Sequence, residues 1–295
     1  MVQYLMKKSI TLIILIFNLS LFAQSKIMLV PYQSYATYNS QSSDTNVSDP
    51  LNNGDLTSGL YFIAYDSTYS FELALEDKSI DYANTKINQI NLVSSYKTYI
   101  SDNVKVNTLI HYASNSRSQS NTIYVPLVAL TYISHSNLNV GLETAYSMYD
   151  SQALSSKVLQ LKPSISFAYG RKDSAWGMLF PKISMYHIIP ISPNSSLKSN
   201  YVSTEFELVH KNGLFTSKVS YWAGEQLYAV RDNGFIIYDI NEIHTSGASI
   251  SSRYKFNKML GLKASYNTEY YNTFGSTKEE YMQKISFVAD FTFWL

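Results

Sequence analysis

The chain contains no cysteine among its 295 residues. Disulfide bonds, thiolate metal sites and cysteine nucleophiles are therefore excluded. Charged residues make up only 15% of the chain, and without Lys7 and Lys8 near the amino terminus 21 basic residues stand against 22 acidic ones. A nearly neutral chain lacks the basic surface that binds nucleic acid, so no nucleic-acid partner is expected.

Only one long hydrophobic run is present, and it lies near the amino terminus. Lys7 and Lys8 precede an apolar run from Ile10 to Phe22, which Ala23 follows. A basic start, a short apolar run and a small residue are typical of a secretory signal peptide, so we expect residues 1–23 to be cleaved. The alternative is a retained anchor, but 13 residues are short against the ~20 of a spanning helix.

The rest of the chain is rich in tyrosine, with 26 residues, and alternates between apolar and polar positions. The last fifteen residues show this most clearly, because one face carries Ile285, Phe287, Phe291 and Phe293. Side chains that alternate in this way indicate β-strands with two different faces. We count fourteen such segments and leave twelve and sixteen open; they span residues 26–39, 57–66, 69–77, 86–100, 104–114, 121–134, 138–150, 157–169, 174–187, 199–210, 213–231, 235–256, 259–272 and 281–295.

The connections between these segments alternate between tight turns and longer polar links. Tight turns are predicted at residues 66–68, 101–103, 135–137, 170–173, 211–213 and 257–258, and longer links at 40–56, 78–85, 115–120, 151–156, 188–198 and 272–280. Outer-membrane barrels have short periplasmic turns and longer outer loops. The pattern therefore predicts an all-β fold, a transmembrane antiparallel up-and-down β-barrel that occupies residues 24–295.

The carboxyl-terminal strand, with Phe291, Phe293 and Trp294, resembles the closing strand of bacterial outer-membrane proteins, although its last residue is Leu295. By architecture alone the mature chain also resembles the monomeric, OmpG-like porins. The resemblance implies a Gram-negative outer membrane, contact with its lipid, recognition of the last strand by the barrel-assembly machinery, and passive diffusion of small hydrophilic solutes. A non-conducting anchor that serves adhesion or an export system is the alternative.

Charged side chains on the polar faces are candidates for a lumenal selectivity site. We expect mixed charges on neighbouring strands to pair and to form a hydrated, self-neutralising wall. The alternative is a selectivity constriction in which a basic group faces an acidic group; the basic residues are Lys218, Arg253, Lys255 and Lys263, and the acidic residues are Glu205 and Glu207. Many tyrosines, Tyr149 and Tyr254 among them, are expected in girdles at the membrane interface.

Two further features concern the backbone. Asp232-Asn233-Gly234 lies between apolar runs, and Asn-Gly in this position predicts a type I′ hairpin, here a flap that extends past the membrane. Two positions are open for this candidate gating flap: it stands above the mouth of the barrel or folds over it. Pro163 and Pro181 fall inside predicted strands, where a missing amide donor predicts a gap between those strands, with the two prolines facing each other.

The five histidines show no metal-ligand spacing, so no metal site and no cofactor are expected. Outer-membrane lipid hydrolases carry a His-x-Ser-Asn motif. The nearest approach is His244-Thr245-Ser246, which lacks the Asn but would place His and Ser on one strand face. The hydrolase is the least favoured alternative, and the prediction is that the chain is not an enzyme.

Overall fold

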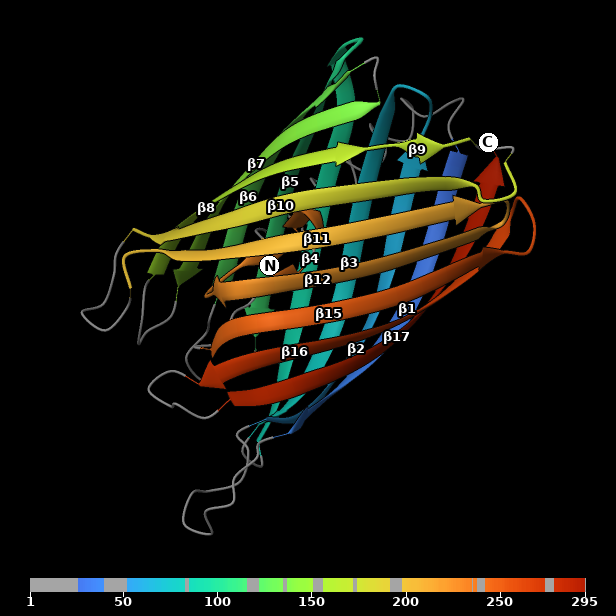
Figure 1. The fold of residues 1–295 in the computed structure, drawn as a ribbon. Coiled ribbons are helices and arrows are strands. Elements are labelled where there is room, and N and C mark those ends of the chain that lie inside the picture. The colour runs from blue at the N-terminus through green and yellow to red at the C-terminus, as the bar shows by residue number, and fades with distance from the viewer. Residues whose placement is uncertain are drawn as a thin grey trace, which may run out of the picture.

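The computed structural model describes residues 26–39, 52–82, 85–115, 122–134, 137–150, 156–171, 174–191, 198–234, 236–237, 242–273 and 279–294. Almost all of them lie in antiparallel strands that form one ring (Figure 1). The strands are β1 (Lys26–Asn39), β2 (Asn52–Tyr65), β3 (Tyr69–Tyr82), β4 (Thr85–Ser101), β5 (Val104–Asn115), β6 (Thr122–Ile133), β7 (Leu138–Asp150), β8 (Ser156–Phe167), β9 (Tyr169–Gly170), β10 (Met178–Pro190), β11 (Tyr201–Asn212), β12 (Phe215–Gln226), β15 (Glu242–Lys255), β16 (Leu260–Thr273) and β17 (Glu279–Trp294).

The ring is closed by the first and last strands. β1 pairs with β17 from Lys26↔Trp294 to Asn39↔Tyr281, and β10 pairs with β11. β9 continues β8 in the same register along β10, so the two count as one strand of the barrel. The barrel therefore has fourteen strands around its circumference. Closure removes both sheet edges, which would otherwise leave unpaired amide and carbonyl groups. The predicted fold class and the strand number are confirmed.

The two faces of each strand differ as the alternation predicted. On β3, Leu75 points outward and is 56% exposed, whereas its neighbours Ala74 and Glu76 point inward and are buried. The same outward exposure recurs around the ring at large apolar residues such as Leu60, Ile90, Ile110, Val128, Leu142, Ile183, Val219, Ile250 and Phe287. An apolar outer face on a closed barrel is the face that lipid wets in a transmembrane barrel.

The predicted alternation of short and long links is wrong at two places. β3 and β4 pair as far as Tyr82↔Thr85, so only residues 83–84 connect them where a longer link was expected. β10 begins at Met178, which leaves seven residues between it and β9 where a tight turn was expected. In the first case polar residues simply continue the ladder, because backbone pairing does not require an apolar side chain.

Pro163 does interrupt the ladder between β8 and β10. The pairs reach Ser184↔Ser164 and resume at His187↔Leu161, so the predicted gap is confirmed. The two prolines do not face each other. Pro181 pairs with Leu208 of β11, and on the β8 side its neighbour Lys182 already pairs with Ser166, three residues beyond Pro163. Each proline has its missing donor on one side of its strand only, and the other side remains paired.

Residues 1–25, which include the predicted signal peptide, and Leu295 lie outside the described residues. In the part of the chain that the structure describes, no helix is long and apolar enough to cross a membrane.

Candidate functional site in the barrel lumen

A short hairpin between β12 and β15 lies inside the barrel. It consists of β13 (Val230–Arg231), the 3₁₀ turn η1 (Asp232–Gly234) and β14 (Ile236–Ile237), and β13 pairs with β14. We refer to residues 227–237 as the inward hairpin. The predicted flap beyond the membrane is therefore wrong in position, and the type I′ turn is absent: a four-residue connection with positive φ at Asp232 and Gly234 replaces it.

The hairpin turns inward because it can bury its apolar side chains there. Leu227, Ala229 and Val230 are at most 1% exposed. They pack in one cluster with inward-facing apolar residues of the wall, namely Leu109, Ala113, Ile123, Val125, Leu127, Ala145, Tyr149, Val158, Tyr186, Ile188 and Tyr201. Each buried Val or Leu contributes about 1.5–3 kcal/mol relative to exposure, so a flap in water would forfeit this stabilisation.

The inner face of β6 is the sequence signal for this cluster. Ile123, Val125 and Leu127 point inward on a strand whose outward face carries Tyr124, Val128 and Leu130. Apolar side chains on the inner face are unfavourable if the lumen holds only water. Apolar residues on both faces of one strand therefore indicate that another segment covers its inner face. Tyr149 belongs to this cluster rather than to an interface girdle, and that prediction is wrong, whereas Tyr254 does face outward and is 45% exposed.

Wall side chains satisfy the polar backbone of the hairpin. The Gln160 side chain donates to the Val230 carbonyl at 2.7 Å and accepts from the Val230 amide at 2.9 Å, which reproduces the bonding of a neighbouring strand. The Tyr149 hydroxyl donates to the carbonyl of Tyr228, and His111 Nδ1 lies 2.8 Å from the carbonyl oxygen of Gly234. Buried backbone groups need such partners, so these contacts fix the depth of the hairpin.

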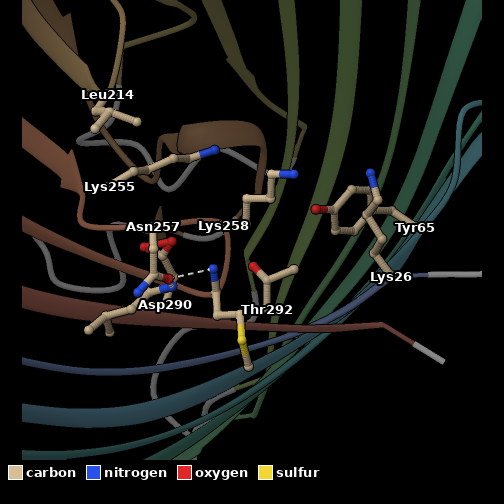
Figure 2. A pocket seen from close by; sticks show the side chains of 10 residues that line it. Lys26, Tyr65, Leu214, Lys255, Asn257, Lys258, Asp290 and Thr292 are labelled. Carbon is tan, nitrogen blue, oxygen red and sulfur yellow. Dashed lines mark hydrogen bonds between the residues drawn. The ribbon is translucent and has the colours of Figure 1, made fainter.

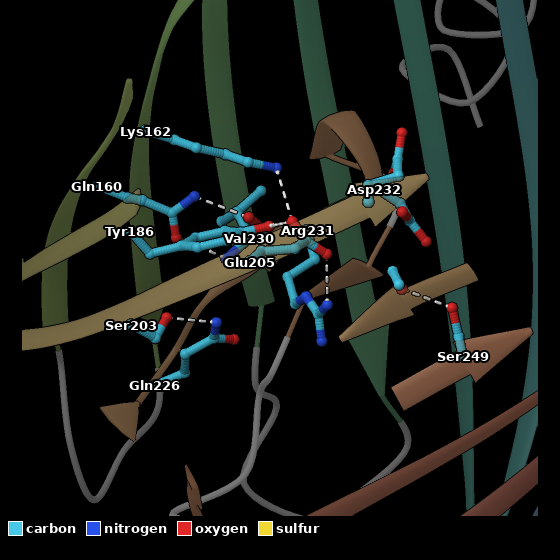
Figure 3. A network of polar contacts seen from close by, with 12 residues as sticks. Gln160, Lys162, Tyr186, Ser203, Glu205, Gln226, Val230, Arg231, Asp232 and Ser249 are labelled. Atoms are coloured by element: carbon cyan, nitrogen blue, oxygen red, sulfur yellow. Dashed lines mark hydrogen bonds and ion pairs between the residues drawn. The ribbon is translucent and has the colours of Figure 1, made fainter. Parts of the chain in front are cut away.

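Arg231 ties the hairpin to the opposite part of the wall (Figure 3). Its Nη2 donates to Glu205 Oε1 of β11 at 2.8 Å, and its Nη1 lies 3.5 Å from Glu269 Oε1 of β16. The guanidinium also lies 4.8 Å from the ring of the buried Trp222. A planar guanidinium suits simultaneous pairing and stacking, which a lysine could not reproduce.

Glu205 makes two further contacts at the same place. Its Oε2 accepts from the Tyr186 hydroxyl at 2.7 Å and lies 3.6 Å from Lys162 Nζ. Lys162 in turn lies over the Tyr186 ring. A carboxylate with one arginine, one lysine and one hydroxyl around it is well compensated although it is buried.

The six predicted lumen residues do not form one constriction. Lys218 pairs with Glu207 of the adjacent strand at 2.6 Å and lies 3.9 Å from Asp232 of the hairpin. Arg253 pairs with Asp290 of β17, and Lys263 is the register partner of Arg253 on β16. Lys255 lies at the short-turn end, and Glu205 is engaged by the hairpin. The acidic and basic groups that pair do so with near neighbours, as the favoured interpretation expected, and the alternative of a facing constriction is wrong.

The nearest approach to a hydrolase motif is broken by a β-bulge. The register shifts between His244 and Ser246 on both sides of β15. His244 points inward, where its Nδ1 lies 3.2 Å from Glu269 Oε2, while Ser246 pairs with the outward-facing Ala223. An extra residue in one strand reverses the faces that follow it, so His and Ser do not share a face. No group of three metal-ligating side chains occurs within the described ranges.

No protein-family model matches the chain, and no curated protein matches it in sequence. Solved structures do match. CymD, described as a monoaromatic hydrocarbon channel, aligns with a TM-score of 0.53 at 8% identity over 92% of this chain and 90% of its own. The toluene transporter TodX of P. putida gives 0.53 at 9% identity over 92% and 90%. A bacterial polysaccharide outer membrane secretin gives 0.51 at 10% identity over 92% and 98%. At such identities the likeness is one of fold: this chain has the fold of outer-membrane β-barrels.

Proposed function

We propose that the chain is a passive channel for small hydrophilic solutes in the outer membrane of a Gram-negative bacterium, and that the inward hairpin is its gate. The observation that carries the proposal is a closed barrel with a largely polar inner wall and a folded segment inside its lumen. Fourteen strands make a barrel wider than the eight-stranded kind that side chains fill and narrower than the open sixteen-stranded porins. Such a lumen holds water once a movable segment leaves it.

The polar wall supports a hydrophilic solute. Buried inward-facing polar residues recur on most strands, including Ser34, Thr57, Gln89, Asn91, Ser95, Asn107, Ser147, Ser184, Ser203 and Ser220. Side chains that donate and accept hydrogen bonds replace part of the water shell of a polar solute. This architecture is also the ground for the likeness to the monomeric, OmpG-like porins.

The surroundings of the barrel belong to the same proposal. Residues 1–23 act as a signal peptide that is removed on export. Outer-membrane lipid covers the apolar outer face, and the barrel-assembly machinery recognises the strand β17 (Glu279–Trp294). No nucleic acid and no cofactor take part.

Conductance in planar bilayers tests the proposal. We expect the wild-type mature chain to show brief openings, and a variant with residues 228–237 replaced by a short glycine–serine linker to stay open with a larger conductance. A heat-modifiable band on gels serves as the control that both barrels are folded. Folded barrels that conduct in neither form would contradict the proposal and would favour the non-conducting anchor.

One observation favours a second candidate, a channel for small apolar solutes. The inward apolar cluster that includes Leu109, Val125 and Leu127 would line part of the lumen when the hairpin leaves. Two of the similar structures are described as a monoaromatic hydrocarbon channel and a toluene transporter. Liposomes that hold the open variant separate the candidates: faster entry of a small sugar supports the hydrophilic channel, and faster partition of toluene without sugar entry supports the apolar one.

A further inference from the structure

A second lumenal feature lies at the short-turn end of the barrel, away from the inward hairpin. It is a pocket of about 530 Å³, and we call it the mouth pocket (Figure 2). The strands β1, β2, β15, β16 and β17 and two turns line it with the residues Lys26, Tyr65, Leu214, Lys255, Asn257, Lys258, Met259, Leu260, Asp290 and Thr292. Pockets for small ligands measure roughly 300–1,000 Å³, so this one is large enough to hold a solute.

The mouth pocket has more positive than negative side chains. Three lysines, Lys26, Lys255 and Lys258, line it beside one carboxylate, Asp290. Arg253 takes up that carboxylate, since its Nε donates to Asp290 Oδ1 at 3.1 Å and its guanidinium forms a second contact with Oδ2. The pocket therefore keeps an excess of positive charge.

A glycine on the intervening strand lets Asp290 reach Arg253. Arg253 and Asp290 belong to β15 and β17, which β16 separates. Gly261 of β16 is the register partner of Asp290, and a Cβ at Gly261 would lie 2.3 Å from Asp290 Oδ1. Because glycine has no side chain, the Asp290 carboxylate lies over the β16 backbone at Gly261. It can therefore contact Arg253, which belongs to the strand on the other side of β16.

Two of these lysines, Lys255 and Lys258, are not neutralised by a side-chain carboxylate of the described residues, since none lies within 4.0 Å of either ammonium group. Lys26 lies over the Tyr65 ring at 5.9 Å, on the other side of the pocket in Figure 2. Asn257 Oδ1 accepts from the amides of Met259 and Leu260, so the NH₂ group of Asn257 is the end that can donate to an anion.

We propose that the mouth pocket binds small anionic solutes that carry a phosphate or a carboxylate group, and that the channel favours such solutes. The inference rests on the proposed channel function for its meaning and on the pocket alone for its chemistry. Ammonium groups are compact donors that bind phosphate and carboxylate as point charges. A cluster of one sign inside low-dielectric walls raises the local concentration of anions, and weak binding lets them leave again.

The test is equilibrium binding of inorganic phosphate and, separately, of succinate to the folded barrel in maltoside detergent, which carries neither group. Line broadening of the ³¹P signal and of ¹³C-labelled succinate reports binding without any current through a bilayer. We expect saturable binding in the millimolar range that weakens as sodium chloride is added. The variant K255Q/K258Q is expected to bind at least about tenfold more weakly, because both positive charges are lost.

The matched control is K86Q/K157Q, which removes two exposed lysines near the long-loop end. It should bind both anions as the wild type does. Absence of saturable binding by the wild type, or equal weakening in the control, would overturn the inference. Binding without conductance would leave the anion site standing and remove the channel, whereas conductance without binding would remove the anion site alone.

Discussion

Arg231 of the inward hairpin donates from Nη2 to Glu205 Oε1 of β11 across 2.8 Å, and both side chains are buried. Val230, the residue before Arg231, is hydrogen-bonded through its backbone to the Gln160 side chain of β8. The hairpin therefore contacts two parts of the barrel wall, an apolar part around β5–β8 and a charged part around β11–β16. Substitutions at Arg231 and at Gly234 disrupt the charged part and the apolar part separately.

Replacing Arg231 by glutamine is expected to open the proposed channel. Loss of one partner of a buried charge pair costs about 2–5 kcal/mol, and the lower end applies because Lys162 still compensates Glu205. About 2 kcal/mol shifts the ratio of closed to open states by roughly 30-fold. Single-channel recordings of open probability measure this shift. The control is Lys198→Gln, which breaks an exposed pair with Glu225 and should leave open probability unchanged.

Gly234→Ala should weaken the docking of the hairpin from its apolar side. Gly234 has φ of +93°, and a Cβ there would lie 2.6 Å from Leu109 Cδ2. The strained backbone conformation alone costs about 1–2 kcal/mol for alanine. We expect a higher open probability. Gly213→Ala is the matched control: it has φ of +56° with nothing within 4 Å, so it should lower barrel stability slightly without more frequent openings.

A charge on the outer face should destabilise the barrel according to depth. Val128 lies near the middle of β6 and is 47% exposed outward. Val128→Arg should lower the free energy of unfolding in lipid vesicles by about 2–4 kcal/mol if lipid covers this face. Tyr132→Arg, near the short-turn end of the same strand, should cost only about 0–1 kcal/mol. Equal and small effects at both positions would mean that water covers the outer face.

No lipid hydrolysis is expected from the pair His244 and Ser246. The β-bulge of β15 places them on opposite faces of the strand, and a serine is a nucleophile only when a base contacts it. Release of fatty acid from phospholipid vesicles should equal the background for the wild type and for Ser246→Ala. Release by the wild type that this variant abolishes would show that the two residues do meet.

The barrel could be predicted from the sequence because its information is local. Period-two alternation assigns each residue to one face, and a strand such as β17 shows both its length and its faces without any partner. Closure also followed, since fourteen antiparallel segments of this kind leave no sheet edge only when the first pairs with the last. The same period of two also placed Glu76, Glu143 and Asp290 on the inner face of the barrel.

The site could not be predicted because its contacts join residues far apart in the chain. His244 and Ser246 have suitable spacing, and one bulged residue cancels it. The residues 232–234 carry a hairpin signal that gives the turn but not its direction, and only the apolar inner wall from β5 to β8 decides that the hairpin turns inward. The apolar residues on both faces of β6 were the available clue.

The sequence by itself therefore determined the strands, their faces and the closed barrel, because those depend on the side-chain period of a single strand. Only the tertiary structure decided what occupies the lumen and which charges meet. Arg231 meets Glu205 because a segment folds back through the ring, and Arg253 meets Asp290 because Gly261 between them has no side chain. Such contacts arise from packing across the barrel, and no spacing along the chain encodes them.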